Sequence, residues 1–399
     1  MDINTDPLKI KEVLERGAEG VIDKEGLAKK MASGRQLRIK FGIDPTAADI
    51  HLGHSVAMRK LAQFQGLGHK AVLIIGEFTA LIGDPSGRAS SRPLLNPEQI
   101  RDNMKNYINQ AAKVIDIDKA EIYYNSEWFG QKPMSFLMDL AGRFTVARLI
   151  EREDFQKRLK DGVDVSMLEL LYPLLQGYDS VAVMADVELG GYDQRLNLLF
   201  GRKVQRAFGQ AEQDVMMVPL LIGIDGEKKM SKSVGNYIKI DESPARMFTQ
   251  IMAIPDGLIW NYFELLTDIS MADIQAKKET VEKQIVHPRD AKMELAYKIV
   301  SIFHDNQAAD SARGEFVRVA QEGKLPTEIP SIAIEEKKLG IPDLLVALGA
   351  VSSKGEARRL AEQGGVKIDG KVKTDWKEAI DVSSGTVVQI GKSKFFKVA

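Results

Sequence analysis

The sequence predicts an α/β fold with a mainly parallel sheet in the first half of the chain, then a helical domain and a small α+β module. Short β-rich runs alternate with helical patterns up to about residue 225, helical spacing dominates residues 242–330, and residues 339–399 combine a capped helix with a hairpin signal. We expect a first domain at 1–225, a loop at 226–241, a helical domain at 242–330, a linker at 331–338 and the module at 339–399.

Five apolar, β-rich runs are the predicted strands of the first domain. They are Leu37–Ile43, Ala71–Ile75, Glu121–Tyr124, roughly Val181–Val187 and Met216–Leu221. In such sheets, ligands bind beyond the carboxyl ends of the strands, where helix N-termini offer unpaired NH groups. We therefore expect binding residues directly after these runs.

Capping and turn signals define elements further along the chain. A helix is predicted from Ala291 to Phe303, with Asp290 as its N-cap. In the module, Ser353 and Glu356 fit a capping box, Gly364-Gly365 ends that helix, and Asp369-Gly370 predicts a two-residue hairpin turn.

Composition excludes several classes of protein. The 399 residues contain no cysteine, which excludes disulfides and cysteine-ligated metal centres. Lys and Arg number 55 and Asp and Glu number 56, so a polyanion would have to bind to a local patch. From Lys338 onward, 11 Lys or Arg face 7 Asp or Glu, which makes the module that patch. We expect a cytosolic protein, with neither an import signal nor a membrane span.

The segment His51-Leu52-Gly53-His54 follows the first predicted strand, where a helix begins. Gly53 allows a base or ribose to approach the backbone, and two imidazoles beside a helix N-terminus can stabilise charge on a phosphoryl group. The alternatives are a surface pair without function and a metal site, for which a third ligand is missing. Two of the chain's five histidines lie here, which favours a functional site.

The basic run KMSKS occupies residues 229–233 between Gly226 and Gly235, which predicts a mobile loop. Ammonium groups on such a loop can close over a polyphosphate and follow its charge into the transition state. A solvated basic loop is the alternative, but the occurrence of KMSKS downstream of HLGH favours phosphate binding. Other common phosphate motifs, G-x-x-x-x-G-K-[ST] and G-x-G-x-x-G, are missing from the sequence.

A third motif, LYPLLQGYDS at residues 171–180, places polar side chains on one face of a helix. Tyr172, Gln176 and Asp179 are spaced four and three residues apart, so they can project together into a pocket. A stripe facing solvent is the alternative. Pro173 lacks an NH donor and disfavours helical geometry at Tyr172, so we expect the helix to begin at Pro173.

HLGH and KMSKS together resemble the two signatures of class I aminoacyl-tRNA synthetases. The stretches FGIDPTAADIHLGH, LIGDPSGR, LYPLLQGYDS and LGGYDQ resemble bacterial tyrosyl-tRNA synthetases over nearly the whole chain. The resemblance implies a Rossmann-like catalytic domain, a helical anticodon-binding domain and an RNA-binding module. It implies that tyrosine attacks the α-phosphate of ATP, with Mg²⁺ offsetting charge, and that the aminoacyl group passes to the terminal ribose of tRNA(Tyr).

The resemblance also assigns roles to single residues. Asp179 would accept a hydrogen bond from the substrate phenol, Gln194 would lie near the substrate carboxyl group, and the ammonium group would be held by Asp84, Tyr172 and Gln176. The ATP side would comprise Asp44, Thr46, His51, Gly53 and His54, with Gly191 and Asp193 at the ribose. Lys229 and Lys232 would stabilise pyrophosphate, so that the catalytic set is His51, His54, Thr46, Lys229 and Lys232.

Two positions differ from parts of the family. Lys40 stands where one bacterial branch has a tyrosine that touches the phenol, so the chain resembles the branch with lysine, and Asp179 remains the main phenol-binding residue. Tyr192 stands where a small hydroxyl residue is expected, and its side chain would either crowd the ribose or point away.

The C-terminal module resembles a small RNA-binding module of a small-subunit ribosomal protein and of some pseudouridine synthases. Its candidate contacts to tRNA phosphates are Lys354, Arg358, Arg359, Lys371 and Lys373, and a solvated basic face is the alternative. The resemblance further implies a homodimer. Two other functions remain open at this point: a tryptophan-specific synthetase of related fold, and a non-catalytic RNA-binding protein on a synthetase scaffold.

Overall fold

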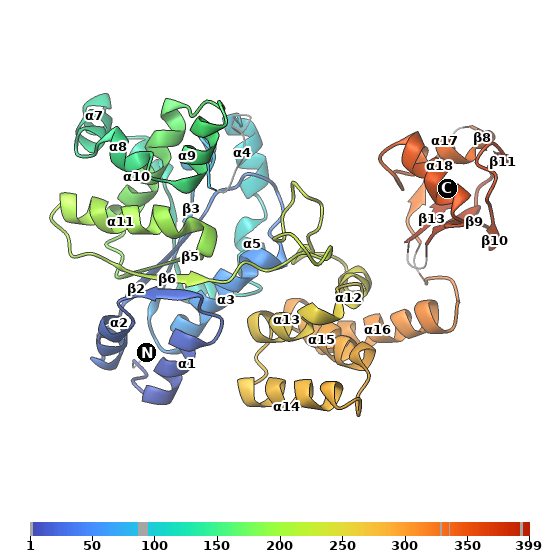
Figure 1. Ribbon diagram of the computed structural model, residues 1–399, viewed down its shortest axis with the longest axis horizontal. Helices are drawn as coiled ribbons and strands as arrows, with labels where there is room; N and C mark the ends of the chain where they lie inside the picture. The colour runs from blue at the N-terminus through green and yellow to red at the C-terminus, as the bar shows by residue number, and fades with distance from the viewer. Residues whose placement is uncertain (1–2, 87–94, 328, 335, 392–393) are drawn as a thin grey trace. The chain divides into compact units, whose positions relative to one another are not determined.

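The computed structural model describes residues 3–86, 95–327, 329–334, 336–391 and 394–399 (Figure 1). The chain divides into two compact units. The first contains Met1–Ser243 and Gln250–Asp305, and the second contains Pro244–Thr249 and Asn306–Ala399. The helical residues that follow the KMSKS loop are thus shared between the units.

A six-stranded sheet with the order β1-β6-β5-β2-β3-β4 forms the centre of the first unit. Its strands are β1 Gly20–Ile22, β2 Arg38–Ile43, β3 Lys70–Ile75, β4 Glu121–Tyr124, β5 Val187–Gly191 and β6 Asp214–Val218. All neighbours pair in parallel except β1 with β6, which confirms the predicted mainly parallel sheet. The strand order reverses between β2 and β5, so the crevice beyond their carboxyl ends is where ligands of such folds bind.

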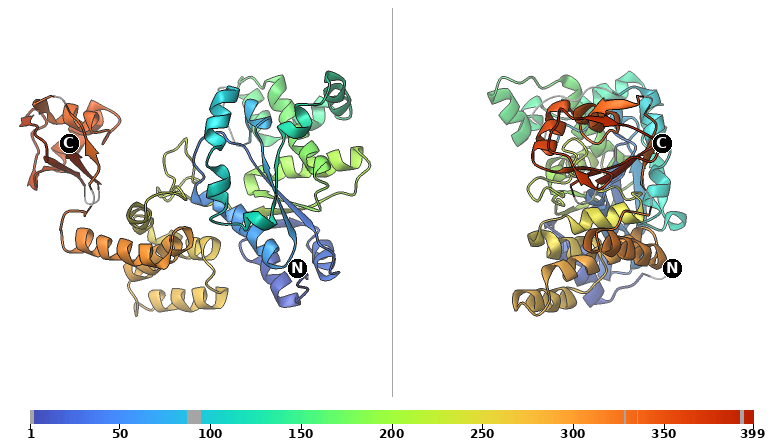
Figure 2. Two further views of the ribbon diagram at one scale, coloured as in Figure 1. Left: turned by 180° about the vertical axis from the view of Figure 1, so that it is seen from behind. Right: turned by 90° about the vertical axis from the view of Figure 1, so that its right-hand side faces the viewer.

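Helices cover the sheet and extend the unit beyond it. Helix α3 packs on β2, β3 and β5, whereas α11 packs on β5 and β6 and lies beside α10 (Figures 1 and 2). The helices up to β6 are α1 Pro7–Glu15, α2 Lys24–Ala32, α3 Leu52–Gly66, α4 Pro97–Met104, α5 Tyr107–Ala111, α6 Ser126–Phe129, α7 Met134–Gly142, α8 Val146–Leu149, α9 Glu153–Lys160, α10 Met167–Ala182 and α11 Arg195–Ala207. After β6 follow α12 Pro244–Met252, α13 Ile259–Leu266, α14 Met271–Glu282 and α15 Pro288–Phe303.

Two predicted strands are displaced. The prediction of a strand at Val181–Val187 was wrong, because α10 continues to Ala182 and β5 begins only at Val187. Val181 packs against the apolar cluster beneath α10, and this burial on a helix overrides the β-propensity of valine. The last predicted strand, Met216–Leu221, corresponds to β6 at Asp214–Val218. It ends earlier than expected because Pro219 has no NH to continue the ladder.

Helix α10 begins at Met167 and contains Pro173 in its interior, so the prediction that it starts at Pro173 was wrong. Ser166 caps it: the Glu169 NH donates to Ser166 Oγ at 3.2 Å, and the Ser166 NH donates to the Glu169 carboxylate at 2.9 Å. This reciprocal capping box sets the start of the helix six residues before the proline.

The predicted N-cap Asp290 was also wrong. Helix α15 starts at Pro288, and its N-cap is His287, whose Nδ1 accepts from the NH of Arg289 at 3.1 Å. Proline is favoured at the first helical position because its missing NH would have no partner there, so the cap precedes it.

The second unit includes α16 Asn306–Phe316 and a C-terminal module of helices and short strands. The module has a five-stranded sheet, β10-β9-β12-β13-β7, and a two-stranded sheet, β11-β8. Its elements are β7 Ser331–Ile332, β8 Lys338–Gly340, α17 Ile341–Ala347, α18 Lys354–Glu362, β9 Val366–Ile368, β10 Lys371–Val372, β11 Ala379–Asp381, β12 Val387–Ile390 and β13 Lys394–Val398. Residues 331–338, suggested as a linker, thus contribute strands to the module.

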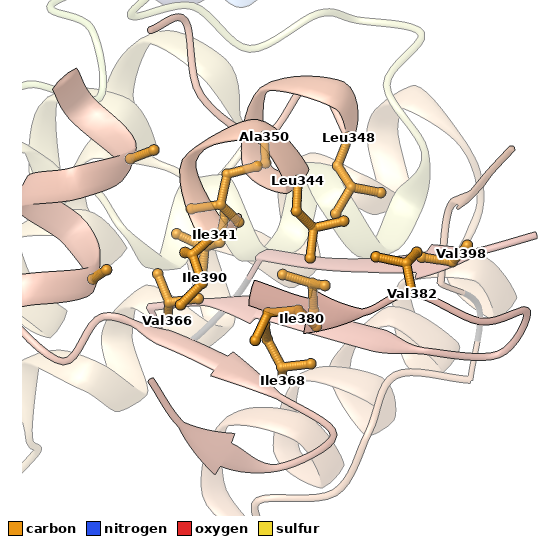
Figure 3. Close-up of a cluster of buried hydrophobic side chains, with 14 residues drawn as sticks. Ile341, Leu344, Leu348, Ala350, Val366, Ile368, Ile380, Val382, Ile390 and Val398 are labelled. Carbon is orange, nitrogen blue, oxygen red and sulfur yellow. The ribbon is translucent and has the colours of Figure 1, made fainter. Parts of the chain in front are cut away.

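Aliphatic side chains from both helices and the sheets fill the module core, among them Ile341, Leu344, Val366 and Ile390 (Figure 3). The hairpin turn at Asp369-Gly370 is confirmed, with φ values of 47° and 78° and Lys371 opposite Ile368. Ser353 caps α18, but the Glu356 carboxylate bonds to Ser352 instead of completing the predicted box. No helix in the described parts of the chain is long and apolar enough to cross a membrane.

Candidate active site

One pocket of about 570 Å³ lies beyond the carboxyl ends of β2 and β5. Its lining includes every candidate residue that the sequence placed on the tyrosine and ATP sides. These are Asp44, Thr46, His51, Gly53, His54, Asp84, Tyr172, Gln176, Asp179, Gly191, Asp193, Gln194, Lys229 and Lys232. The motif LIGDPSGR reaches this pocket through Asp84 and Ser86, while its last two residues, 87 and 88, lie outside the described residues.

His51 and His54 stand at the N-terminus of α3 with their rings stacked at 3.8 Å. Burial, together with the nearby Lys232 and Lys229, lowers the pKa of His51 to about 3, and burial lowers the pKa of His54 well below its usual value. Both imidazoles are therefore neutral near pH 7. His54 Nδ1 accepts from the His51 NH at 3.3 Å, so the proton of neutral His54 resides on Nε2, ready to donate.

Close packing favours glycine at residue 53. A Cβ there would lie 3.0 Å from two atoms of the His51 ring. The glycine thus sets the place of the imidazole and also keeps backbone accessible from the pocket.

Asp179 lies deep in the pocket, with only 4% of its surface exposed. Its two oxygens accept from different donors, the Trp128 indole NH at 3.0 Å and the Asn125 amide at 3.4 Å. Burial raises the pKa of the Asp179 carboxyl to about 7, although Lys40, Trp128 and Asn125 favour the charged form. The result is a carboxylate fixed in direction and still able to accept a further hydrogen bond.

Asn125 and Trp128 lie outside every motif that the sequence singles out. Asn125 directly follows β4, so it sits at the same edge of the sheet as the residues after β2 and β5. Position after a strand was the signal that could have identified it. Asn125 also donates to Thr79 Oγ1 at 3.0 Å, which joins it to the next group of pocket residues.

Asp44 links two segments that line the pocket, helix α10 and the turn after β3. It accepts from the Tyr172 hydroxyl at 2.8 Å and from Thr79 Oγ1 at 2.7 Å. Gly76 makes room for it, because a Cβ at residue 76 would lie 2.0 Å from Asp44 Oδ1. Burial and the nearby Asp44 carboxylate raise the pKa of Tyr172 well above its usual value, so its hydroxyl remains a donor.

A polar network fixes Asp84 from behind. Gln194 Nε2 donates to Asp84 Oδ2 at 2.6 Å, and Asn197 donates to Gln194 Oε1 at 2.8 Å. Buried Arg152 in turn donates to Asn197 Oδ1 at 2.5 Å and to Ser86 Oγ at 3.1 Å. Ser86 belongs to the motif LIGDPSGR, whereas Arg152 and Asn197 carried no sequence signal, since the network joins segments far apart in the chain.

The hydrogen bonds of the Lys40 ammonium group go to Glu188 and to α10, and not to the Asp179 carboxylate. The ammonium group is buried and donates to Glu188 at 2.8 Å, to Ser180 Oγ at 2.8 Å and to the Gln176 carbonyl at 3.0 Å. Lys40 and Glu188 are each 1% exposed. The pair therefore forms part of the pocket wall and holds α10, which carries Gln176 and Asp179.

The loop lysines reach the open side of the pocket. Lys229 Nζ forms a 2.7 Å ion pair with Asp193, and Lys232 Nζ donates to the Ala47 carbonyl at 3.4 Å. Gly191 allows Asp193 to approach, because a Cβ there would lie 2.8 Å from its carboxylate. Tyr192 is 46% exposed and is not part of the pocket lining, so it points away from the site.

The candidate tRNA contacts lie in the second unit. Lys354, Arg358 and Arg359 are exposed on α18, Lys371 is exposed on β10, and Lys373 is half-buried just beyond it. Ion pairs already engage Lys354 with Asp343, Arg358 with Glu362 and Lys373 with Glu378. The Arg358 guanidinium also lies 4.5 Å from the centre of the Trp376 ring.

Comparison with known proteins identifies both parts of the chain. Residues 31–320 match the family model of class I tRNA synthetases (W and Y), and residues 321–398 match the SYY-like C-terminal domain of tyrosine–tRNA ligase. The tyrosine–tRNA ligase of Thermotoga maritima is 46% identical over 97% of this chain and 96% of its own length. That of Bordetella pertussis is 48% identical over 97% of this chain and 95% of its own length.

Solved structures support the fold. A C-terminally truncated mitochondrial tyrosyl-tRNA synthetase from Aspergillus nidulans matches 78% of this chain and 93% of its own, with a TM-score of 0.67 and 22% identity. The Archaeoglobus fulgidus tyrosyl-tRNA synthetase, solved with L-tyrosine, matches 77% of this chain and 100% of its own, with a TM-score of 0.62 and 21% identity. From its sequence relatives, the chain belongs to the tyrosine–tRNA ligase family of class I aminoacyl-tRNA synthetases.

Proposed function

We propose that this chain activates tyrosine with ATP and transfers the product to tRNA(Tyr). The observation that carries the proposal is one pocket in which a buried, oriented Asp179 carboxylate lies with the HLGH residues and the KMSKS lysines. The first group selects an amino acid with a terminal hydroxyl, and the others bind a nucleotide polyphosphate. Eight curated relatives that are 44–49% identical to this chain are named tyrosine–tRNA ligase, which supports the same substrate.

In the activation step, an oxygen of the tyrosine carboxylate forms a bond to the α-phosphorus of ATP. The bond between the α-phosphorus and the bridging oxygen breaks, and pyrophosphate leaves with that electron pair. No proton has to be removed from the nucleophile. Catalysis therefore depends on aligning the carboxylate with the α-phosphorus and on stabilising the negative charge that develops on the phosphates. This fits a site whose histidines are neutral and whose lysines stand on a loop.

Each group of residues has a proposed task. Asp179 accepts from the phenol, while Asp84, Tyr172 and Gln176 hold the ammonium group, with Gln194 near the carboxyl end. On the ATP side, neutral His54 donates from Nε2 to a phosphate oxygen and Asp193 receives the ribose. Lys229 and Lys232 follow the charge of the departing pyrophosphate.

The residues present suit a magnesium ion that arrives with ATP. Among the described residues, no group of three or more His, Cys, Asp or Glu could hold a metal ion. Mg²⁺ commonly binds through substrate phosphates and water with few protein ligands, so ATP would carry most of its coordination. When bound, it would offset negative charge on the phosphates.

A homodimer is the proposed assembly, and an exposed apolar surface supports it. Helices α7 and α8 both pack on α10, and their outer faces carry unusually exposed apolar side chains. On α7, Met134 is 72% exposed and Met138 70%, and on α8, Val146 is 54% exposed; Met167, the first residue of α10, is 68% exposed. Several large apolar residues exposed together commonly mark an interface. Met138→Glu should therefore yield monomers in analytical ultracentrifugation, whereas Met271→Glu, at an exposed methionine on α14, should not.

The function is tested by amino-acid-dependent exchange of pyrophosphate into ATP, run with each of the twenty amino acids. Tyrosine alone should support exchange, and the product should aminoacylate tRNA(Tyr). Exchange with tryptophan would overturn the proposed substrate. Absence of exchange with every amino acid would instead favour a non-catalytic RNA-binding protein.

A further inference from the structure

The segment that carries the pocket lysines consists of a hairpin and a tight turn. In the hairpin, Ile222 pairs with Lys229, and the Gly223 NH donates to the Lys228 carbonyl at 2.8 Å. Lys229 therefore belongs to the hairpin.

The turn follows at once and carries the second lysine. It closes where the NH of Gly235 donates to the carbonyls of Ser231 and Lys232, each at 3.1 Å. Met230 connects the two parts along the chain, and one backbone hydrogen bond joins them directly, from the Ile224 NH in the hairpin to the Asn236 carbonyl after the turn at 3.0 Å.

Asn236 joins the two parts. It is 4% exposed, and its side chain bonds backbone groups on both sides. Its Oδ1 accepts from the Ser231 NH in the turn at 2.8 Å, while its Nδ2 lies 3.2 Å from the carbonyls of both Lys228 and Lys229 in the hairpin. Nδ2 also donates to Asp225 Oδ2 at 2.9 Å.

Asp225 and Gly223 complete this arrangement. Asp225 Oδ1 accepts from the NH groups of Glu227 and Lys228, each at 3.2 Å, so the carboxylate that bonds Asn236 also closes the end of the hairpin. A Cβ at Gly223 would lie 2.3 Å from Asn236 Cγ, so the amide packs directly on the backbone. We call the side chains of Asn236 and Asp225 the Asn236 clamp.

We propose that Asn236 is a positioning residue of the proposed activation step: by holding the hairpin to the turn, the Asn236 clamp sets where Lys229 and Lys232 stand before ATP binds. The inference rests on the proposed function. Asn236 is not part of the pocket lining, so it acts through the lysines and not by contact with substrate.

Loss of the clamp should affect ATP-dependent steps and leave tyrosine binding alone. Misplacement of catalytic groups by about 1 Å can slow a reaction by about 100-fold, and Asn236→Ala should slow adenylate formation up to that extent. Affinity for tyrosine without ATP should not change, because Asp84 and Asp179 lie on other segments. In the absence of substrates, trypsin should cut after the lysines of the released loop faster than in the parent protein.

Three further variants separate positioning from general damage. Asp225→Ala removes the exposed member of the clamp, so it keeps the test available should Asn236→Ala fail to fold. Asn236→Asp places a second carboxylate next to that of Asp225, so the two side chains repel each other. The swap Asp225→Asn with Asn236→Asp restores a donor–acceptor pair and should recover part of the rate of adenylate formation. The matched control is Asn4→Ala, which removes an amide that accepts from the Asp6 NH far from the loop in sequence.

Unchanged tryptic cleavage and unchanged rates in both Asn236→Ala and Asp225→Ala would overturn the proposal. So would a parallel loss of tyrosine affinity, since that is the mark of a general structural role. The cleavage comparison needs no substrate. If the parent protein failed to exchange pyrophosphate, the proposed function would fall while cleavage still reported on the clamp.

Discussion

Replacing Asp179 by asparagine should weaken tyrosine binding selectively. Trp128 and Asn125 each donate to a different oxygen of Asp179, so an amide must turn its NH₂ group toward one of these donors. The variant loses the charged acceptor and creates a mismatch at a residue that is 4% exposed, where water cannot replace the lost partner.

The size of the effect follows from the bond that is lost. A hydrogen bond to a charged group contributes about 1.5–3 kcal/mol. At about 1.4 kcal/mol per tenfold, tyrosine affinity should fall about 10- to 100-fold. Phenylalanine has no phenol hydroxyl to lose, so its weak use as a substrate should not fall, and discrimination between the two should narrow.

Tyrosine-dependent pyrophosphate exchange and calorimetric binding without ATP would measure this loss. The same substitution at Asp310, an exposed residue paired with Arg313, is the matched control and should change neither quantity. Equal losses for tyrosine and phenylalanine, or no loss for either, would refute the assignment of Asp179 to the phenol.

The pH dependence gives a second measurement on the same residue. Burial raises the pKa of Asp179 to about 7 in the unliganded protein, so the carboxyl is mainly protonated below that pH. A phenol donor favours the charged form, so tyrosine affinity should rise as pH rises through 7 and level off above it. Asp179→Asn should abolish this rise, and its persistence in the variant would assign the titration to another group.

Three further changes test other parts of the molecule. Lys232→Ala should slow adenylate formation by about 100- to 1000-fold, because the transition state loses one charge-stabilising donor. Tyrosine affinity in the absence of ATP should not change, and stopped-flow kinetics would measure the slower adenylate formation. Removing residues 331–399 should impair tRNA charging more than pyrophosphate exchange, and charging by the full chain should weaken with added salt; equal losses would contradict an RNA-binding module. Leu344→Ala should destabilise the module by about 2–5 kcal/mol, seen by hydrogen exchange of residues 338–391, and pyrophosphate exchange should persist.

Local patterns predicted much of the fold. Strands β2, β3 and β4 follow from short β-rich runs, and the turn at Asp369-Gly370 follows from the two residues that tolerate positive φ. Errors arose where one local signal was given priority over another. Pro173 favours a helix start, but Ser166 and Glu169 form a capping box upstream of it. Val181 has a high β-propensity, but it packs against the apolar cluster as part of α10.

The pocket was predictable where residues follow a strand or share a motif. Asp44 and His51 come after β2, and Asp193 comes after β5, so one edge of the sheet collects them. The supporting residues were not predictable in this way. Arg152 bonds to Asn197 and Ser86, which lie far from it in the chain and are brought together only by folding. Asn236 bonds to residues close to it in the chain, but in an irregular loop whose side-chain contacts no helix or strand periodicity predicts.

The buried Lys40–Glu188 pair limits how the amino-acid pocket can be redesigned. Both residues line the pocket, so enlarging it for a bulkier tyrosine analogue invites replacement of Lys40. Changing Lys40 alone would leave Glu188 as an uncompensated charge in the interior, which destabilises a protein by about 3–5 kcal/mol. A library for altered substrate choice should therefore vary the two positions jointly, with uncharged pairs of similar volume, and leave Asp179 for a separate round.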